Sequence, residues 1–300
     1  MSKEALSSSR PLTFSNRNPM PVFADIRSSI QHHAAQPSED LDREAAREAF
    51  DALLLALESG EARSAERGDD GIWRANAWVK QGILLGFRLG GIVDFSSGVF
   101  SFFDKETFPV RQIQATDGVR VVPGGSTIRR GAYVSSGVVC MPPMYINVGA
   151  YVDEGTMVDS HALVGSCAQI GKRVHLSAAA QVGGVLEPVG AVPVVVEDDV
   201  FVGGGCGIYE GCVVRERAVL ASGVILTRST RVYDLVNETI LRSSADASLE
   251  IPAGAVVVPG SRSVDSGFGR EHGLSLSAPC IVKYRDASTD ASTTLEEALR

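Results

Sequence analysis

The sequence predicts a mainly β chain: a parallel β-helix in the middle, a small α-rich domain before it and a short extension after it. An aliphatic residue recurs at every sixth position from Ile128 to Val182, and the same period resumes from Val196 to Val232. Glycine accounts for 31 of the 300 residues, as expected of a chain that turns often. A period of six matches neither the helical repeat of about 3.6 residues nor the strand repeat of about two, so it indicates a solenoid.

The repeat is long and regular. Ten positions run from Ile128 to Val182 without a slip, and nine of them are aliphatic. The residues four places further on are mostly small or β-branched, as at Ala150 and Ala162. We expect each hexad to form a short strand and a corner, with the aliphatic side chain inward and Gly or Asp at the corner. Three hexads then close one triangular coil, and coils stack about 4.8 Å apart.

The segments before the repeat differ from it in composition. Residues 1–36 are polar and rich in Ser, which predicts a flexible extension. Residues 37–118 predict the α-rich domain, with a first helix from Ser38 to Gly60 and a second, buried helix within residues 72–90. The inner face of the first helix is expected to carry Leu41, Ala45, Ala49, Leu53 and Leu57; the second is expected to bury Trp73, Trp78, Leu84, Leu85 and Phe87.

The β-helix is predicted over residues 119–259, with a break in its register. Val182 and Val196 are fourteen residues apart, so GGVLEPVGAVP is expected to bulge out of a coil, a common place for function. A second excursion, DLVNETILRSSADASLE, precedes a last repeat at Ile251 and Val257. Residues 260–300 form the C-terminal extension, which ends in the capped helical turn TTLEEALR.

Charge and composition argue against several classes of protein. The net charge of −8 and the lack of a Lys/Arg run argue against nucleic-acid binding. No apolar run reaches the roughly 18 residues of a membrane span, and the first residues lack the apolar segment of a signal peptide. Five cysteines without a CxxC pair indicate reduced thiols and a cytoplasmic location.

Several motifs resemble the tetrahydrodipicolinate N-succinyltransferases of the lysine and diaminopimelate pathway. They are RVVPGG, NVGAYVDEGTMVDSHALVGSCAQIGKRVHLS, GGVLEP, STRVYD and LEEALR, and the likeness covers residues 40–300. It implies a left-handed β-helix, a homotrimer with active sites between subunits, and transfer of succinyl from succinyl-CoA to the amino group of 2-amino-6-oxopimelate, the opened form of tetrahydrodipicolinate. Succinyl-CoA would be a co-substrate, and no metal is implied.

Acyl transfer from a thioester to an amine needs a base for the amine, donors for the oxyanion and cations for the substrate carboxylates. Asp159 follows the inward Val158 and matches a substrate-binding Asp of the family, which makes it the candidate amine ligand and base. The alternative is a turn cap, as at Asp153, which holds an equivalent place in its hexad. Glu187, in the register-breaking loop, is the second catalytic candidate; its alternative role is to keep the loop hydrated.

The remaining candidates bind substrate or CoA. Arg120 matches a substrate-binding Arg of the family, and Arg231 is a candidate for a second carboxylate or a partner of Asp234. Gly183 and Gly184 would let the backbone approach the thioester and donate N–H groups, unless they serve only a turn. The last group is expected to follow the pantetheine arm and the phosphates of CoA: Ala221, Ser222, Gly223, Lys283 and Arg285.

One departure from the family concerns a catalytic candidate. Where relatives carry Arg-Ser-Glu, this chain has Gly205, Cys206 and Gly207. Either the chain relies on Asp159, which we favour, or Glu210 reaches in from a shifted position, or the activity is altered. The third possibility motivates a rival hypothesis, a noncatalytic trimeric scaffold, beside that of an acyltransferase that uses acetyl-CoA.

The cysteines and histidines are weaker candidates, for a nucleophile and for a zinc site. Cys167 lacks an evident base, and Cys140, Cys206 and Cys212 fall on inward positions that favour core packing. His161 and His175 lie fourteen residues apart, which does not match the coil, and zinc would need three convergent ligands.

Overall fold

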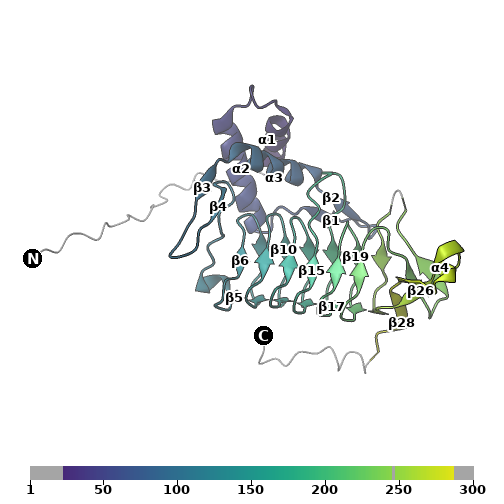
Figure 1. Cartoon of the computed structure of the whole chain (residues 1–300). Helices are drawn as coiled ribbons and strands as arrows, with labels where there is room; N and C mark the ends of the chain where they lie inside the picture. The colour runs from purple at the N-terminus through teal and green to yellow at the C-terminus, as the bar shows by residue number, and fades with distance from the viewer. Residues whose placement is uncertain (1–22, 245–246, 287–300) are drawn as a thin grey trace, which may run out of the picture.

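The computed structural model describes residues 23–244 and 247–286, with Phe23 and Ala24 described by their backbone alone. The chain forms a long three-sided β-helix with three helices packed beside it and a small β-rich unit at its C-terminal end (Figure 1). No described helix is long and apolar enough to cross a membrane. The predicted helical turn TTLEEALR lies outside the described residues.

The N-terminal domain consists of α1 (Phe23–Ala35), α2 (Arg43–Glu58) and α3 (Ala77–Leu89), which pack on one another. The prediction of a flexible extension over residues 1–36 is wrong for residues 23–35. Ile26 and Ile30 stand one helical turn apart, and both are buried against the other helices. Two aliphatic residues in a polar segment are too few to establish a helical period, so the sequence did not predict this helix.

The predicted first helix is confirmed but begins later than expected. It starts after Asp42, whose side chain accepts a hydrogen bond from the Ala45 amide at 3.2 Å, a typical N-cap. The second helix begins only at Ala77, so Trp73 lies in a strand instead of the helix. That strand belongs to the hairpin β1 (Ala65–Arg67) and β2 (Trp73–Ala75); a second hairpin, β3 (Ile92–Asp94) and β4 (Phe103–Lys105), precedes the 3-10 turn η1 (Ala115–Asp117).

The β-helix has the predicted register. Tyr151 pairs with Tyr133 and with Gln169, so partners are 18 residues apart and three hexads close one coil. All ladders between coils are parallel and form three faces. The N-terminal domain packs on the covered face: β7 (Tyr133–Val134), β10 (Tyr151–Val152), β13 (Gln169–Ile170), β16 (Val195–Val196), β19 (Val213–Val214) and β24 (Glu250–Ile251).

Among the described residues, the three long helices do not pack on the two other faces (Figure 1). The long face comprises β5 (Arg120–Val121), β8 (Val139–Cys140), β11 (Met157–Val158), β14 (His175–Leu176), β17 (Phe201–Val202), β20 (Val219–Leu220) and β25 (Ala255–Val258). The open face comprises β6 (Thr127–Ile128), β9 (Tyr145–Ile146), β12 (Leu163–Val164), β15 (Gln181–Val182), β18 (Gly207–Ile208) and β21 (Ile225–Leu226).

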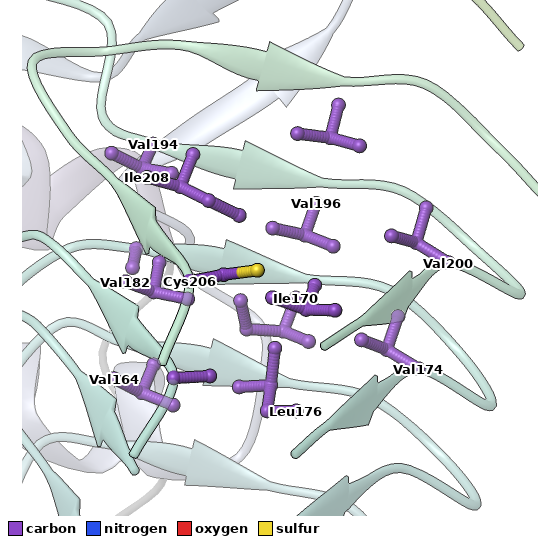
Figure 2. Packing of buried hydrophobic residues seen from close by; sticks show 14 of the residues in the cluster. Val164, Ile170, Val174, Leu176, Val182, Val194, Val196, Val200, Cys206 and Ile208 are labelled. Atoms are coloured by element: carbon purple, nitrogen blue, oxygen red, sulfur yellow. The ribbon is translucent and has the colours of Figure 1, made fainter. Parts of the chain in front are cut away.

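The inward aliphatic ladder forms the core of the solenoid. Val164, Ile170 and Leu176 lie on its three faces and are fully buried, and each stacks on its equivalents in neighbouring coils (Figure 2). Cys206 and Cys212 are also fully buried within this core, which confirms the packing role predicted for them. Such a core depends on nearest-neighbour contacts, so one missing ladder position weakens two interfaces at once.

The predicted ladder ends earlier than expected. Val232 does not stack on Val214, whose partner is Ile251. Residues 227–244 leave the regular coil instead, and Val232 lies in β22 (Val232–Asp234), which pairs with β23 (Thr239–Leu241) and β28 (Cys280–Tyr284). The hairpin β26 (Ser261–Ser263) and β27 (Ser275–Ser277), with the short helix α4 (Gly267–Glu271), completes the C-terminal unit.

Candidate functional site

The break in register opens a hollow on the surface of the solenoid. Gln169 pairs with Val195 at a spacing of 26 residues instead of 18, so eight extra residues leave the coil between β15 and β16. Beneath them is a hollow of about 850 Å³. Its lining comes from three segments: Gly183–Val185 with Glu187, Pro188 and Gly190–Val192; Tyr209–Gly211; and Thr227, Arg228, Ala247 and Ser248.

Contacts from two directions hold the inserted loop in place. The ammonium of Lys80, a fully buried residue of α3, donates a hydrogen bond to the Ala191 carbonyl at 2.5 Å. Burial lowers the pKa of this ammonium below its ordinary value. On the other side, Gly211 has a positive φ of 74° and lies so close to the Val192 carbonyl that a Cβ would be 2.5 Å from its oxygen. These contacts hold the inserted loop, which forms the rim of the hollow, in one position.

Four residues singled out from the sequence line this hollow: Gly183, Gly184, Glu187 and Glu210. The amide of Gly183 donates to the Ile208 carbonyl at 2.8 Å, so it belongs to the ladder of the coil and is not the oxyanion donor we considered. Gly184 packs against the neighbouring corner, since a Cβ on Gly165 would lie 2.2 Å from its nitrogen. Both glycines are thus required for close approach between coils.

Two carboxylates lie in the lining. Glu187 is exposed and has no hydrogen-bond or ion-pair partner among the described residues. Glu210 has a positive φ of 55°, and its Oε2 accepts a hydrogen bond from the Arg228 amide at 3.0 Å. The pair gives the hollow acceptor oxygens that can attract an ammonium group.

The position without the family's Glu is occupied by an aromatic ring. Gly207 points outward from the open face, and a Cβ there would lie 2.4 Å from Cε2 of Tyr209. Tyr209, which directly follows the inward Ile208, is not among the residues singled out from the sequence. An outward glycine in a strand was the available signal, since it often marks a close approach.

Asp159 lies on a different corner, where the chain passes from the long face to the open face. It is half-buried, and its Oδ1 accepts a hydrogen bond from the Ser160 amide at 2.7 Å. Amides of this corner bond from coil to coil, from Ala179 to Ser160, from Gly205 to Ala178 and from Gly223 to Gly204. Ala221, Ser222 and Gly223 therefore lie on the corner that carries Asp159, three coils along.

The predicted cations are spread along the molecule. Arg120 is exposed in the first strand of the long face, two coils before the strand that leads to Asp159. Arg231 is exposed just before β22, and Asp234 is bonded instead by the Tyr284 hydroxyl and the side chain of Asn237. Lys283 lies in β28 with its Nζ 3.5 Å from Asp286. Within one chain, these cations do not surround the hollow.

Cysteine and metal chemistry find little support in the geometry. Cys167 is fully buried, and burial raises the pKa of its thiol to about 11, so the reactive thiolate is scarce at neutral pH. His175 stacks on Phe201 with ring centroids 5.0 Å apart, and His161 is exposed at a corner. Over residues 23–244 and 247–286, no group of three or more His, Cys, Asp or Glu side chains could hold a metal ion.

A parallel β-helix with an 18-residue coil and an inserted loop over a hollow is the architecture of the hexapeptide-repeat proteins. The family profile described as tetrahydrodipicolinate N-succinyltransferase N-terminal matches residues 25–89, and that of the hexapeptide repeat of succinyl-transferase matches residues 193–228. The first of these regions includes most of α1, in agreement with its folded state.

Curated relatives extend the match over most of the chain. A Polynucleobacter asymbioticus protein named 2,3,4,5-tetrahydropyridine-2,6-dicarboxylate N-succinyltransferase is 44% identical over 260 residues, covering 85% of this chain and 90% of its own. A Delftia acidovorans protein of the same name is 43% identical over 284 residues, covering 92% and 95%. The chain belongs to the tetrahydropyridine-2,6-dicarboxylate N-succinyltransferase family.

A solved structure supports the fold alone. A Campylobacter jejuni protein described as a 2,3,4,5-tetrahydropyridine-2-carboxylate N-succinyltransferase superposes with a TM-score of 0.50 at 14% identity. The match covers 82% of this chain and 64% of that one. It agrees with the left-handed β-helix expected from the sequence.

Proposed function

We propose that this chain transfers the succinyl group of succinyl-CoA to the amino group of L-2-amino-6-oxopimelate, a step of lysine and diaminopimelate biosynthesis. One observation carries the proposal: relatives with this enzyme name are about 44% identical over 85% of the chain. The amine nitrogen bonds to the thioester carbon, the C–S bond breaks with its electron pair on sulfur, and the amine proton passes to a base.

The roles of the residues follow from their chemistry. Asp159 would bind the amine and take its proton, and Glu187 would assist from the rim of the hollow. Arg120 and Arg231 would hold substrate carboxylates, because guanidinium groups bind them bidentately. Gly183, Gly184, Ala221, Ser222, Gly223 and Lys283 would line the path of CoA.

This assignment requires more than one copy of the chain. Asp159 and the hollow lie at opposite edges of the open face, so a single chain does not bring them together. In a homotrimer with parallel solenoids, the Asp159 corner of one subunit can face the inserted loop of the next. We propose this arrangement, with active sites between subunits, and a cytoplasmic location, where succinyl-CoA is made; the five cysteines are all free.

The test is release of free thiol from succinyl-CoA, with and without L-2-aminopimelate as a stable acceptor, with acetyl-CoA in parallel. Acceptor-dependent release that favours succinyl-CoA is the expected result. Preference for acetyl-CoA would reassign the donor. No release with either donor, from a protein that sedimentation shows to be a trimer, would favour a noncatalytic scaffold.

A further inference from the structure

Two glycines on neighbouring coils form a seat for the ring of Tyr209. A Cβ on Gly183 would lie 2.7 Å from Cδ1 of the ring, and a Cβ on Gly207 would lie 2.4 Å from Cε2 and 2.9 Å from the hydroxyl oxygen. Neither glycine has a positive φ, so backbone conformation does not require them. The space that the Tyr209 ring occupies explains why both positions are glycine. The position of the ring in turn fixes where its hydroxyl lies.

The seated hydroxyl is available to a ligand. Tyr209 is half-buried in the lining of the hollow, and its hydroxyl has no hydrogen-bond partner among the described residues. Nearby side chains serve other purposes: Glu187 and Glu210 can accept but not donate when ionised. The Thr227 hydroxyl bonds to those of Ser229 and Thr230, and the Arg228 guanidinium donates to the Ser244 carbonyl at 3.1 Å.

We propose that the Tyr209 hydroxyl donates a hydrogen bond to the thioester carbonyl oxygen of the bound acyl-CoA. The inference rests on the proposed acyl transfer and adds a catalytic residue to it. As the amine nitrogen bonds to the carbonyl carbon, the oxygen gains negative charge, and a donor already fixed at that point stabilises it. When the C–S bond breaks, the electron pair on the oxygen forms the C=O bond again and the oxygen loses its negative charge. The phenol donates a hydrogen bond but keeps its proton throughout. The Gly183 amide, which bonds to Ile208, does not supply this donor.

The first variant is Tyr209→Phe, which keeps the ring in its seat and removes only the hydroxyl. Loss of one oxyanion donor lowers kcat by roughly 10²-fold or more, so we expect a fall of that size with little change in KM for succinyl-CoA. The matched control is Tyr233→Phe, which removes another half-buried hydroxyl, in β22. An unchanged kcat in Tyr209→Phe, or a loss confined to KM, overturns the inference.

A second variant moves the hydroxyl without removing it. Gly207→Ala places a methyl group where the ring lies, so we expect a loss of kcat comparable to that of Tyr209→Phe. Gly91→Ala is its control, because a Cβ there meets nothing within 4 Å. Ser248→Ala tests a further hydroxyl in the lining; a large loss there with normal turnover in Tyr209→Phe would assign the donor to Ser248.

An infrared measurement separates this inference from the proposed function. Succinyl-CoA labelled with ¹³C at the thioester carbonyl is bound without acceptor, and its C=O band is compared between wild type and Tyr209→Phe. We expect a lower wavenumber in the wild type, because a hydrogen bond to the oxygen weakens the C=O bond. Identical bands overturn the inference even if turnover is normal, whereas a shifted band in a protein without turnover overturns only the proposed function.

Discussion

The ammonium of Lys80 donates a hydrogen bond to the carbonyl of Ala191, and this contact joins the N-terminal helical domain to the inserted loop of the solenoid. The two residues are 111 positions apart in the sequence. Lys80 is fully buried, and burial lowers the pKa of its ammonium below the ordinary value. The rim of the candidate site thus depends on a domain that contributes no residue to the lining of the hollow.

Lys80→Met should make the free energy of unfolding depend less on pH in the alkaline range. Between the lowered folded pKa and the ordinary value of 10.5, the unfolded chain binds a proton that the folded chain lacks. The free energy of unfolding of the wild type therefore rises with pH across this range, and the variant lacks that contribution. Urea unfolding at several pH values should show the stability of wild type relative to Lys80→Met increasing with pH.

Lys105→Met provides the control for this titration. Lys105 also donates to a backbone carbonyl, that of Gly90 at 2.8 Å, but it is only half-buried and lies away from the inserted loop. If both variants changed the pH dependence equally, or if neither did, the role given to the buried ammonium of Lys80 would be wrong.

Asp159→Asn should preserve the fold and the oligomer while kcat falls by roughly 10²-fold or more, the usual contribution of a general base. Asn keeps an oxygen that can accept from the Ser160 amide, so the local turn is retained. Asp153→Asn is a matched control, because Asp153 makes the same kind of bond to the Glu154 amide at 2.8 Å on another corner. Near-normal turnover of Asp159→Asn would remove this carboxylate from the mechanism.

The solenoid was predictable because its signal is local and repeated. Each inward residue, such as Val152, contacts equivalent aliphatic residues 18 positions away on either side, so the same chemical requirement recurs along the sequence. The inserted loop was predictable for the same reason, since a fixed period makes a slip visible. The exit of the chain before Val232 was not predictable, because a valine with the right spacing can pair with Leu241 of β23 instead.

The details of the site depend on contacts between distant residues, which the six-residue repeat does not predict. Glu187 could be placed in the loop, but the seat of Tyr209 needs Gly183 and Gly207 from different coils. The burial of Lys80 likewise depends on the inserted loop lying over it. A lysine in a helix ordinarily indicates an exposed position, so the sequence suggested no such contact.

Cys167→Ala should leave succinyl transfer within about twofold of wild type and lower the free energy of unfolding by about 1 kcal/mol, a common size for a small core truncation. The thiol is fully buried, and its pKa of about 11 leaves little thiolate at neutral pH. Thiol-release assays and urea unfolding measure the two effects. A collapse of activity in a folded trimer would instead support a thioester on Cys167.

Glu197→Ala should detach the β1–β2 hairpin from the covered face. This carboxylate is 7% exposed and accepts hydrogen bonds at 2.8 Å from both the Trp73 indole and the Arg215 guanidinium. We expect a loss above the roughly 1 kcal/mol of a surface pair but below the roughly 3–5 kcal/mol of a fully broken buried pair, because Arg215 keeps its second partner, Glu250. Urea unfolding measures the loss, and hydrogen exchange should show faster exchange in residues 65–75.

The control for Glu197→Ala is Glu154→Ala. Glu154 is 66% exposed and lies 3.7 Å from the Lys172 ammonium, and such surface pairs contribute about 1 kcal/mol or less. Glu197→Gln adds a further comparison, since it keeps the shape and one acceptor oxygen but removes the charge that faces Arg215. We expect it to lie between wild type and Glu197→Ala. Equal losses in Glu154→Ala and Glu197→Ala would show that the hairpin is held by its apolar contacts rather than by the buried carboxylate.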